Sequence, residues 1–366
     1  MSAAAAVSSA LLQQDPLTDS QIIDSYKYAA SMVSKVVANG YIGMVKTIPQ
    51  MYRFLYHRAE KATEVGRFRT WAHQFTAANL RSVIVDVKPD VVVCTHAFPC
   101  GVMSEYKKEF SDAPPVVGVV TDFVVHSFWI HRNIDGYAVA THEMRNALIA
   151  RGVSSERVVV SGIPVSGLFS RHASNRMRLR AELHLPRDRH VVLIMGGGLG
   201  IGPLEMMMRA LNAVKGPLSA VVIVGKNARL ERRVLEAAQQ MNYPLRIVHF
   251  VENVYDYMHA SDLLLSKPGG LTSAEALVAN LPMVLVKPLP GQEERNTRFL
   301  VERKAAVRSR SQVHLSRLVQ ELLASPERLH AMRASMQTLA RPDAAEKVAE
   351  LIVSVATGGL TAACGV

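Results

Sequence analysis

The chain of 366 residues is poor in cysteine and has no long apolar run. Its three cysteines, at positions 94, 100 and 364, are too few and too unevenly spaced for a disulfide framework, which favours a reducing compartment. No apolar stretch approaches the ~20 residues that span a bilayer, and no charged region precedes the alanine-rich start. We therefore predict a cytoplasmic protein that is neither secreted nor transmembrane.

Common cofactor motifs are also absent. The sequence has no P-loop, and the glycine run at 196–200 fits no G-x-G-x-x-G frame. The next predicted strand ends in Gly225 and Lys226 rather than in the acid that binds an NAD ribose, which disfavours hydride chemistry. Cys94, His96 and Cys100 lack a fourth ligand and zinc-type spacing. We therefore predict no metal and no bound cofactor.

Positive charge is in excess. The net charge is +11, and residues 1–165 carry 16 basic and 14 acidic side chains, whereas 166–366 carry 26 and 17. Arginines are densest from Arg171 to Arg189, where we place the start of a second domain. A basic balance of this size indicates a polyanionic partner, and the composition leaves nucleic acid, anionic membrane and phosphorylated ligand open.

Short β-branched runs alternate with helical patterns, which is typical of doubly wound parallel sheets. We predict an α/β fold with two Rossmann-like domains, 1–165 and 166–340, and a C-terminal helix and tail at 341–366. Strands are predicted at 91–95, 116–120, 137–140 and 157–160, then at 191–195, 220–224, 246–250, 262–265 and 283–286.

The segment SKPGGLTSAEAL at 266–277 carries the most informative chemistry. Gly269 and Gly270 let the backbone approach a ligand, and Thr272 is predicted to cap a helix that runs to about Val278. The free amides of such a helix start form an anion site, and Glu275 can accept hydrogen bonds from a ribose. The alternative is a glycine-rich turn that only closes a loop.

A polar loop, PLPGQEERN at 288–296, follows the next predicted strand. Ligands of doubly wound folds bind at the carboxyl ends of strands, and Gln292, Glu293 and Asn296 offer groups that recognise sugar hydroxyls. A solvated polar helix start remains the alternative for each of these residues.

These motifs resemble the GT-B glycosyltransferases. GGGLG, SKPGGLTSAEAL and PGQEERN, with PDVVVCTHAFP (89–99), VVTDFVVHSFWIH (119–131) and SGIPVSGLF (161–169) in the first half, are similar to the branch that contains the monogalactosyldiacylglycerol synthases and the processive diacylglycerol glucosyltransferases. The resemblance implies a UDP-hexose donor in the second domain, a lipid acceptor such as diacylglycerol at the first, and inverting, metal-independent transfer.

The resemblance also assigns residues. Residues 250–254 are implied to border the uracil. The implied contacts of the diphosphate, ribose and donor sugar are Gly198, Lys267, Gly269, Gly270, Thr272, Glu275, Gln292, Glu293 and Asn296. UDP-sugar is then a co-substrate, and helix amides would stabilise the charge that grows on UDP.

One family feature is missing. The family's first strand leads into a glycine-rich Gly-His loop, whereas this chain opens on a helical pattern, AAAAVSSALLQQ. We expect the chain to begin one strand late, either because the start is misassigned or because the loop and the activity are lost. The alternatives to a glycosyltransferase are a non-catalytic nucleotide-sugar-binding paralogue and a UDP-sugar 2-epimerase of the same fold.

Two groups remain as candidates for taking the acceptor proton. Asp122 and His96 lie at the ends of neighbouring predicted strands, although a residue in such a place more often caps a turn.

Aromatic and basic residues alternate over residues 41–71, as in segments that lie at a membrane surface. Single-stranded nucleic acid and a packed amphipathic helix are the alternatives, but the resemblance favours an anionic membrane at the inner face of the cell membrane and no nucleic acid. The predicted acceptor and membrane contacts are Tyr52, Arg53, Phe54, Tyr56, His126 and Trp129.

Overall fold

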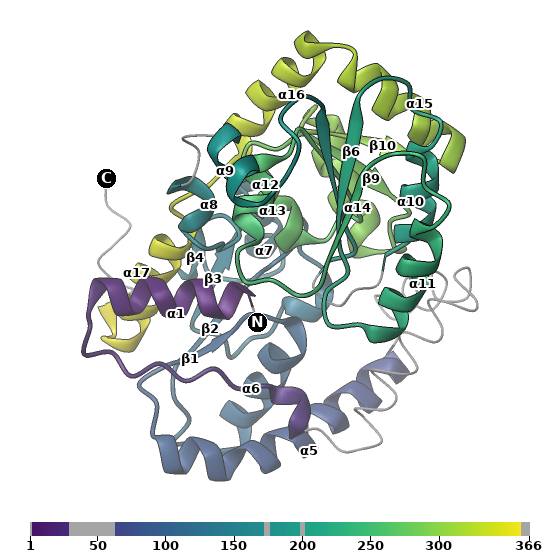
Figure 1. Ribbon diagram of the computed structural model, residues 1–366. Helices are drawn as coiled ribbons and strands as arrows, with labels where there is room; N and C mark the ends of the chain where they lie inside the picture. The colour runs from purple at the N-terminus through teal and green to yellow at the C-terminus, as the bar shows by residue number, and fades with distance from the viewer. Residues whose placement is uncertain (1, 29–62, 172–175, 198–201, 360–366) are drawn as a thin grey trace. The chain divides into compact units, whose positions relative to one another are not determined.

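The computed structural model describes residues 2–28, 63–171, 176–197 and 202–359 (Figure 1). The chain divides into two compact units, and the main break lies between Ser166 and Gly167. Unit 1 comprises Met1–Ser166, Leu289–Gln292 and Asp343–Val366, and unit 2 comprises Gly167–Pro288 and Glu293–Pro342. The C-terminal helix predicted at 341–366 as a part of its own therefore groups with unit 1.

Unit 1 contains a parallel sheet in the order β1-β2-β3-β4. Its strands are β1 (Val92–Cys94), β2 (Val116–Val119), β3 (Gly136–Val139) and β4 (Val158–Val160). Its helices are α1 (Ser2–Gln14), α5 (Thr63–Val87), α6 (Ala97–Glu109), α7 (His142–Ile149) and α17 (Ala344–Ala356), with short turns η1 (Ser25–Lys27), η3 (Ser127–Trp129) and η4 (Ser155–Arg157). The four predicted strands of the first half are confirmed to within two residues.

The two ends of the chain pack together in unit 1. Helices α1 and α17 lie side by side, as the purple and yellow ribbons of Figure 1 show, and alanines 6, 10, 345 and 349 form their close contact. Val7 of α1 and Val348 of α17 join the same core as Val117 and Val119 of β2. The alanine-rich start is therefore a helix that covers one face of the sheet.

Unit 2 contains a six-stranded parallel sheet in the order β10-β9-β8-β5-β6-β7. This is the doubly wound order, in which the chain builds one half of the sheet outward and then returns to the centre for the other half. The strands are β5 (His190–Met195), β6 (Leu218–Ile223), β7 (Leu245–Val248), β8 (Leu263–Ser266), β9 (Met283–Val286) and β10 (Ala306–Ser309). The predicted fold class is confirmed, and among the described strands of this sheet the edge strand β10 is the one that was not predicted.

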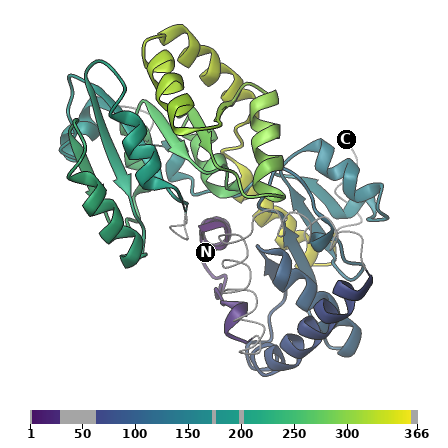
Figure 2. The same cartoon turned by 90° about the vertical axis from the view of Figure 1, so that its right-hand side faces the viewer.

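Helices cover both faces of this sheet (Figures 1 and 2). One face packs its alternate strand side chains, such as Ile194 and Val222, against leucines and methionines of α10, α11, α15 and α16. The helices of unit 2 are α8 (Leu168–Arg171), α9 (Arg176–Glu182), α10 (Leu204–Leu211), α11 (Ala228–Ala238), α12 (Val254–Ala260), α13 (Gly270–Val278), α14 (Gln292–Glu302), α15 (Gln312–Leu323) and α16 (Pro326–Leu339). None of the described helices combines the length and the apolarity that a membrane crossing needs.

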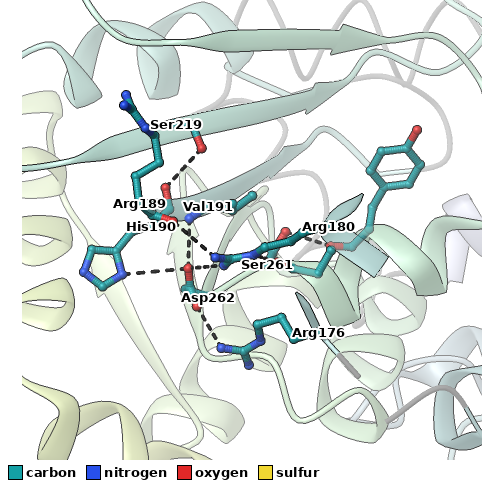
Figure 3. A network of polar contacts seen from close by, with 10 residues as sticks. Arg176, Arg180, Arg189, His190, Val191, Ser219, Ser261 and Asp262 are labelled. Carbon is teal, nitrogen blue, oxygen red and sulfur yellow. Dashed lines mark hydrogen bonds and ion pairs between the residues drawn. The ribbon is translucent and has the colours of Figure 1, made fainter. Parts of the chain in front are cut away.

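A buried ion network holds the amino edge of this sheet (Figure 3). Asp262, just before β8, accepts hydrogen bonds from Arg180 at 2.6 Å, from Arg176 at 2.8 Å and from the amide of Val191 at 2.8 Å. Arg180 also donates to the carbonyl of Ala260. The network fixes α9 against the starts of β5 and β8, so the arginine-rich stretch has a structural role here.

Candidate functional site

The centre of the unit 2 sheet is the point at which its strand order reverses. There Met195, at the end of β5, lies opposite Ser266, at the end of β8. Gly197 has φ +76°, and a Cβ atom on it would lie 2.9 Å from Cε of Lys267, so the two loops that follow these strands are in contact. Open α/β sheets bind ligands at such a reversal, outside the carboxyl ends of the strands.

Helix α13 begins at this point with free backbone amides. Its N-cap is Gly269, which has no side chain to cap the helix, and the amides of Gly270, Leu271 and Thr272 have no acceptor in the part of the chain that the structure describes. No atom lies within 4 Å of a Cβ built on Gly269, so this side of the turn is open. Together with the positive end of the helix dipole, these amides form an anion site.

The predicted cap at Thr272 is wrong. The helix starts three residues earlier than that prediction requires, because the extended backbone at Gly269 (φ −68°, ψ 141°) already turns the chain into α13. Thr272 is therefore the third helical residue and is buried. The predicted end of the helix at Val278 is confirmed.

Glu275 lies in the second turn of α13. Its side chain is partly exposed, and its carboxyl group makes no hydrogen bond or ion pair with another described residue. Burial raises the pKa of Glu275 to about 8, so the carboxyl group is mainly protonated at pH 7 when the site is empty. An acid without a protein partner, beside an open anion site, is available to bind the hydroxyls of a ligand.

The first turns of α14 support the loop before α13. Glu293 pairs with Lys267 at 2.7 Å, and both side chains are largely buried. Asn296 is fully buried and donates to the carbonyl of Pro268 at 3.2 Å. In this conformation the two residues hold the loop in place, and their predicted contact with a donor sugar stays a prediction.

Gln292 groups with unit 1, where its amide is hydrogen-bonded to the ring of His126. The predicted contact of Gln292 with a donor sugar also stays a prediction. His126 and Trp129 have exposed fractions of only 2% and 1%. This burial contradicts their predicted contact with a membrane surface, whereas their predicted contact with the acceptor stays a prediction.

The burial of Trp129 has a clear cause. The hydroxyl of Tyr137, on β3, donates to the carbonyl of Trp129 at 2.9 Å and accepts from the amide of His131 at 3.1 Å. This pair of bonds holds the turn η3 down on the sheet. The turn therefore points its largest ring inward.

His96 and Asp122 follow β1 and β2, which are neighbours in the unit 1 sheet. His96 is the N-cap of α6, and its Nδ1 accepts from the amide of Phe98 at 3.3 Å. His96 is exposed at the surface, yet desolvation of the ring by the protein around it lowers the pKa of His96. A neutral ring that accepts at Nδ1 carries its proton on Nε2. The predicted choice between His96 and Asp122 as the base stays a prediction.

Five predicted residues, Gly198, Tyr52, Arg53, Phe54 and Tyr56, lie outside the described residues. Among the residues that the structure does describe, no three His, Cys, Asp or Glu side chains are placed to hold a metal ion. Burial raises the pKa of Cys94 to about 12 and that of Cys100 well above its usual value, so both thiols stay protonated and are poor metal ligands.

Two contacts of the site were not predicted. These are the ion pair of Lys267 with Glu293 and the hydrogen bond of Gln292 with His126. The sequence contained one signal for the ion pair, because Lys267 and Glu293 follow two strands that are neighbours in the sheet. It contained none for the second, whose partners are 166 residues apart.

Both halves of the chain match known families. Residues 1–165 match the model described as monogalactosyldiacylglycerol (MGDG) synthase, and residues 191–348 match the glycosyltransferase family 28 C-terminal domain. The processive diacylglycerol beta-glucosyltransferase of Bacillus mycoides (strain KBAB4) is 29% identical over 343 residues, which are 93% of this chain and 87% of that protein.

Solved structures share the fold. MurG from Acinetobacter baumannii has a TM-score of 0.56 at 20% identity, over 78% of this chain and 79% of that one. MnaA from S. aureus, solved with UDP, has a TM-score of 0.59 at 17% identity, over 78% of this chain and 80% of that one. At such low identity the likeness establishes the fold alone.

Proposed function

We propose a reaction on the premise that this chain is a glycosyltransferase of the GT-B fold, related to the monogalactosyldiacylglycerol synthases and the processive diacylglycerol glucosyltransferases. The reaction is the transfer of a hexose from a UDP-sugar to the hydroxyl group of a membrane lipid such as diacylglycerol. The observation that carries the donor half is the uncapped start of α13 at the reversal point of the unit 2 sheet.

The donor would bind along the carboxyl edge of the unit 2 sheet. Its diphosphate would accept hydrogen bonds from the amides of Gly270, Leu271 and Thr272, and its ribose hydroxyls would contact Glu275. The pair Lys267–Glu293 would keep the loop in the position that presents these amides. A carboxyl group accepts hydrogen bonds better when it is ionised, so we expect donor binding to lower the pKa of Glu275.

The chemical step would need one base and one stabilised leaving group. The lipid hydroxyl attacks the anomeric carbon on the face opposite UDP, the bond from that carbon to the phosphate oxygen breaks, and its electron pair stays on UDP. Asp122 of unit 1 would take the hydroxyl proton. The helix amides would stabilise the charge on the β-phosphate without a metal ion, and the configuration at the anomeric carbon would invert.

The acceptor requires a lipid surface. We propose that the protein binds peripherally to the anionic inner face of the cell membrane, with the aromatic and basic residues of 41–71 as the contact. The net charge of +11 supports this association, because cations near an anionic surface are attracted to it. Neither a nucleic acid nor a bound cofactor is part of the proposal.

The direct test is product formation. The purified full chain is incubated with UDP-glucose or UDP-galactose and with vesicles that contain diacylglycerol, and the lipid fraction is analysed by mass spectrometry. We expect a hexosyl-diacylglycerol whose anomeric configuration, read by NMR, is opposite to that of the donor. Adding EDTA should leave the rate unchanged.

Two other outcomes would overturn the proposal. UDP binding without glycolipid from either sugar would indicate a non-catalytic nucleotide-sugar-binding protein. A changed sugar nucleotide formed without any lipid would indicate a 2-epimerase.

A further inference from the structure

Lys226 and Phe250 form a contact at the carboxyl edge of the unit 2 sheet, away from the start of α13. Lys226 follows β6 and Phe250 follows β7, and the ammonium nitrogen of Lys226 lies 4.2 Å from the centre of the Phe250 ring. The ring of Phe250 is 51% exposed, and Lys226 is exposed as well. One face of this exposed aromatic ring is therefore covered by the side chain of Lys226.

The residues on either side of Lys226 fix the position of its backbone. Gly225, before it, has φ +70°, and Asn227, after it, caps α11 by accepting from the amide of Leu230 at 3.1 Å. No atom lies within 4 Å of a Cβ built on Gly225, so the space beside the lysine is open. The long, flexible side chain therefore starts from a fixed point, with open space beside the residue before it and the ring of Phe250 at its end.

Lys226 has no acidic partner among the described residues. The nearest ion pair along the chain joins His249 to Glu231, at 3.2 Å, and does not involve the lysine. The contact with Phe250 is of the cation–π type, which is weak at an exposed site. A phosphate group offers an ammonium a stronger partner than an aromatic ring does.

The strand order places Lys226 between Phe250 and the anion site. Strand β6 pairs with β7 on one side and with β5 on the other, and β5 pairs with β8, which leads into α13. At about 4.8 Å per strand, Phe250 and the start of α13 are roughly 14 Å apart along the edge. A nucleoside diphosphate with its phosphates at α13 can span this distance, and its ribose and inner phosphate would then pass Lys226.

We propose that Lys226 exchanges partners when a nucleotide binds, leaving the ring of Phe250 to the base and contacting the phosphate next to the ribose. The inference rests on the proposed function, since it needs a nucleotide at this edge. The resemblance already implies that residues 250–254 border the base, and the new role is that of Lys226, which distinguishes a nucleotide from a nucleoside.

The test compares three ligands with and without phosphate. UDP, UMP and uridine are titrated by calorimetry into the full chain and into the variants Lys226→Met and Phe250→Leu. We expect Lys226→Met to weaken UDP and UMP about tenfold and to leave uridine unchanged or slightly tighter, because one charge-assisted hydrogen bond to phosphate is lost. Phe250→Leu should weaken all three by a similar factor, because it removes base stacking.

Two controls make the result specific. Lys226→Arg keeps the charge and should retain most of the UDP affinity. Lys215→Met removes the same charge from an exposed loop before β6, at the opposite edge of the sheet, and should change nothing.

The outcomes separate this inference from the proposed function. UDP binding to Lys226→Met that equals wild type, or an equal loss for UDP and uridine, would overturn the role of Lys226 alone. Failure of wild type to bind UDP would instead overturn the donor site and, with it, this inference.

Discussion

The two edges of the unit 2 sheet differ in how their polar groups are bonded. At the amino edge, Asp262 accepts three hydrogen bonds, and Arg180 donates to Asp262 and to two backbone carbonyls (Figure 3). At the carboxyl edge, the first amides of α13 and the carboxyl group of Glu275 have no partner among the described residues. Because this side of the turn is open and Glu275 is partly exposed, these groups are available to water or to a ligand.

The difference suggests separate roles for the two edges. We expect the amino edge to contribute to the stability of the fold and little to activity. We expect the carboxyl edge to contribute to activity and little to stability. Variants on the amino edge should therefore lose stability, and variants on the carboxyl edge should lose ligand affinity.

The largest effect is expected for Asp262→Ala. It leaves Arg180 buried without its carboxylate, which we expect to lower the free energy of unfolding by about 3–5 kcal/mol, measured by urea denaturation. Arg178→Ala is the matched control, because the pair Arg178–Glu182 is exposed to solvent and should contribute little to stability. Equal losses for the two variants would mean that the amino edge is not the stabilising one.

Gly269→Asp should make the protein slightly more stable but should weaken its binding of UDP. The backbone of Gly269 suits any residue and has open space beside it, so aspartate can cap α13 and raise the melting temperature slightly. The same carboxylate would occupy the amides and repel the diphosphate, so UDP affinity should fall by about 100-fold or more. Gly269→Ala is the control and should keep most of the affinity. If Gly269→Asp bound UDP normally, the anion site would lie elsewhere.

Glu275 should make donor binding depend on pH. With a pKa of about 8, its carboxyl group is mainly protonated at pH 7 and mainly ionised at pH 9, so UDP affinity should rise up to roughly tenfold over this range. Glu275→Gln should bind UDP more weakly at pH 9 and show no such rise. A wild-type affinity that does not change with pH would contradict the ribose role.

The same group should affect folding in the opposite direction. The pKa of Glu275 is higher in the folded state than in the unfolded state, so its protonated form favours folding. The contribution is complete below the unfolded pKa, near 4.5, and is lost as the pH rises to about 8. Wild type should therefore lose stability relative to Glu275→Gln between these pH values. Parallel unfolding curves would show that the carboxyl group ionises normally.

The smallest effect is expected for Thr272→Val. Its hydroxyl group does not cap α13, so removing it should change the free energy of unfolding by less than about 0.5 kcal/mol. A loss near 1 kcal/mol would restore the capping role that the sequence favoured.

Local patterns predicted the sheets better than the side-chain contacts. Buried β-branched runs marked nine strands, but β10 (Ala306–Ser309) has two polar residues in four and lies at the edge of its sheet. The glycine turn indicated the anion site, while the choice between Gly269 and Thr272 as cap depended on the backbone path. Partners such as Lys267 and Glu293 meet only when distant loops fold together, and the burial of Trp129 depends on Tyr137 in another element.

We expect a nucleoside diphosphate to bind the free amides of α13. Hydrogen–deuterium exchange of the full chain, with and without saturating UDP, tests it directly. UDP should slow exchange at Gly270, Leu271 and Thr272 and leave exchange at Val191, on the amino edge, unchanged. Unchanged exchange at these three amides, under conditions in which calorimetry shows UDP to be bound, would contradict it.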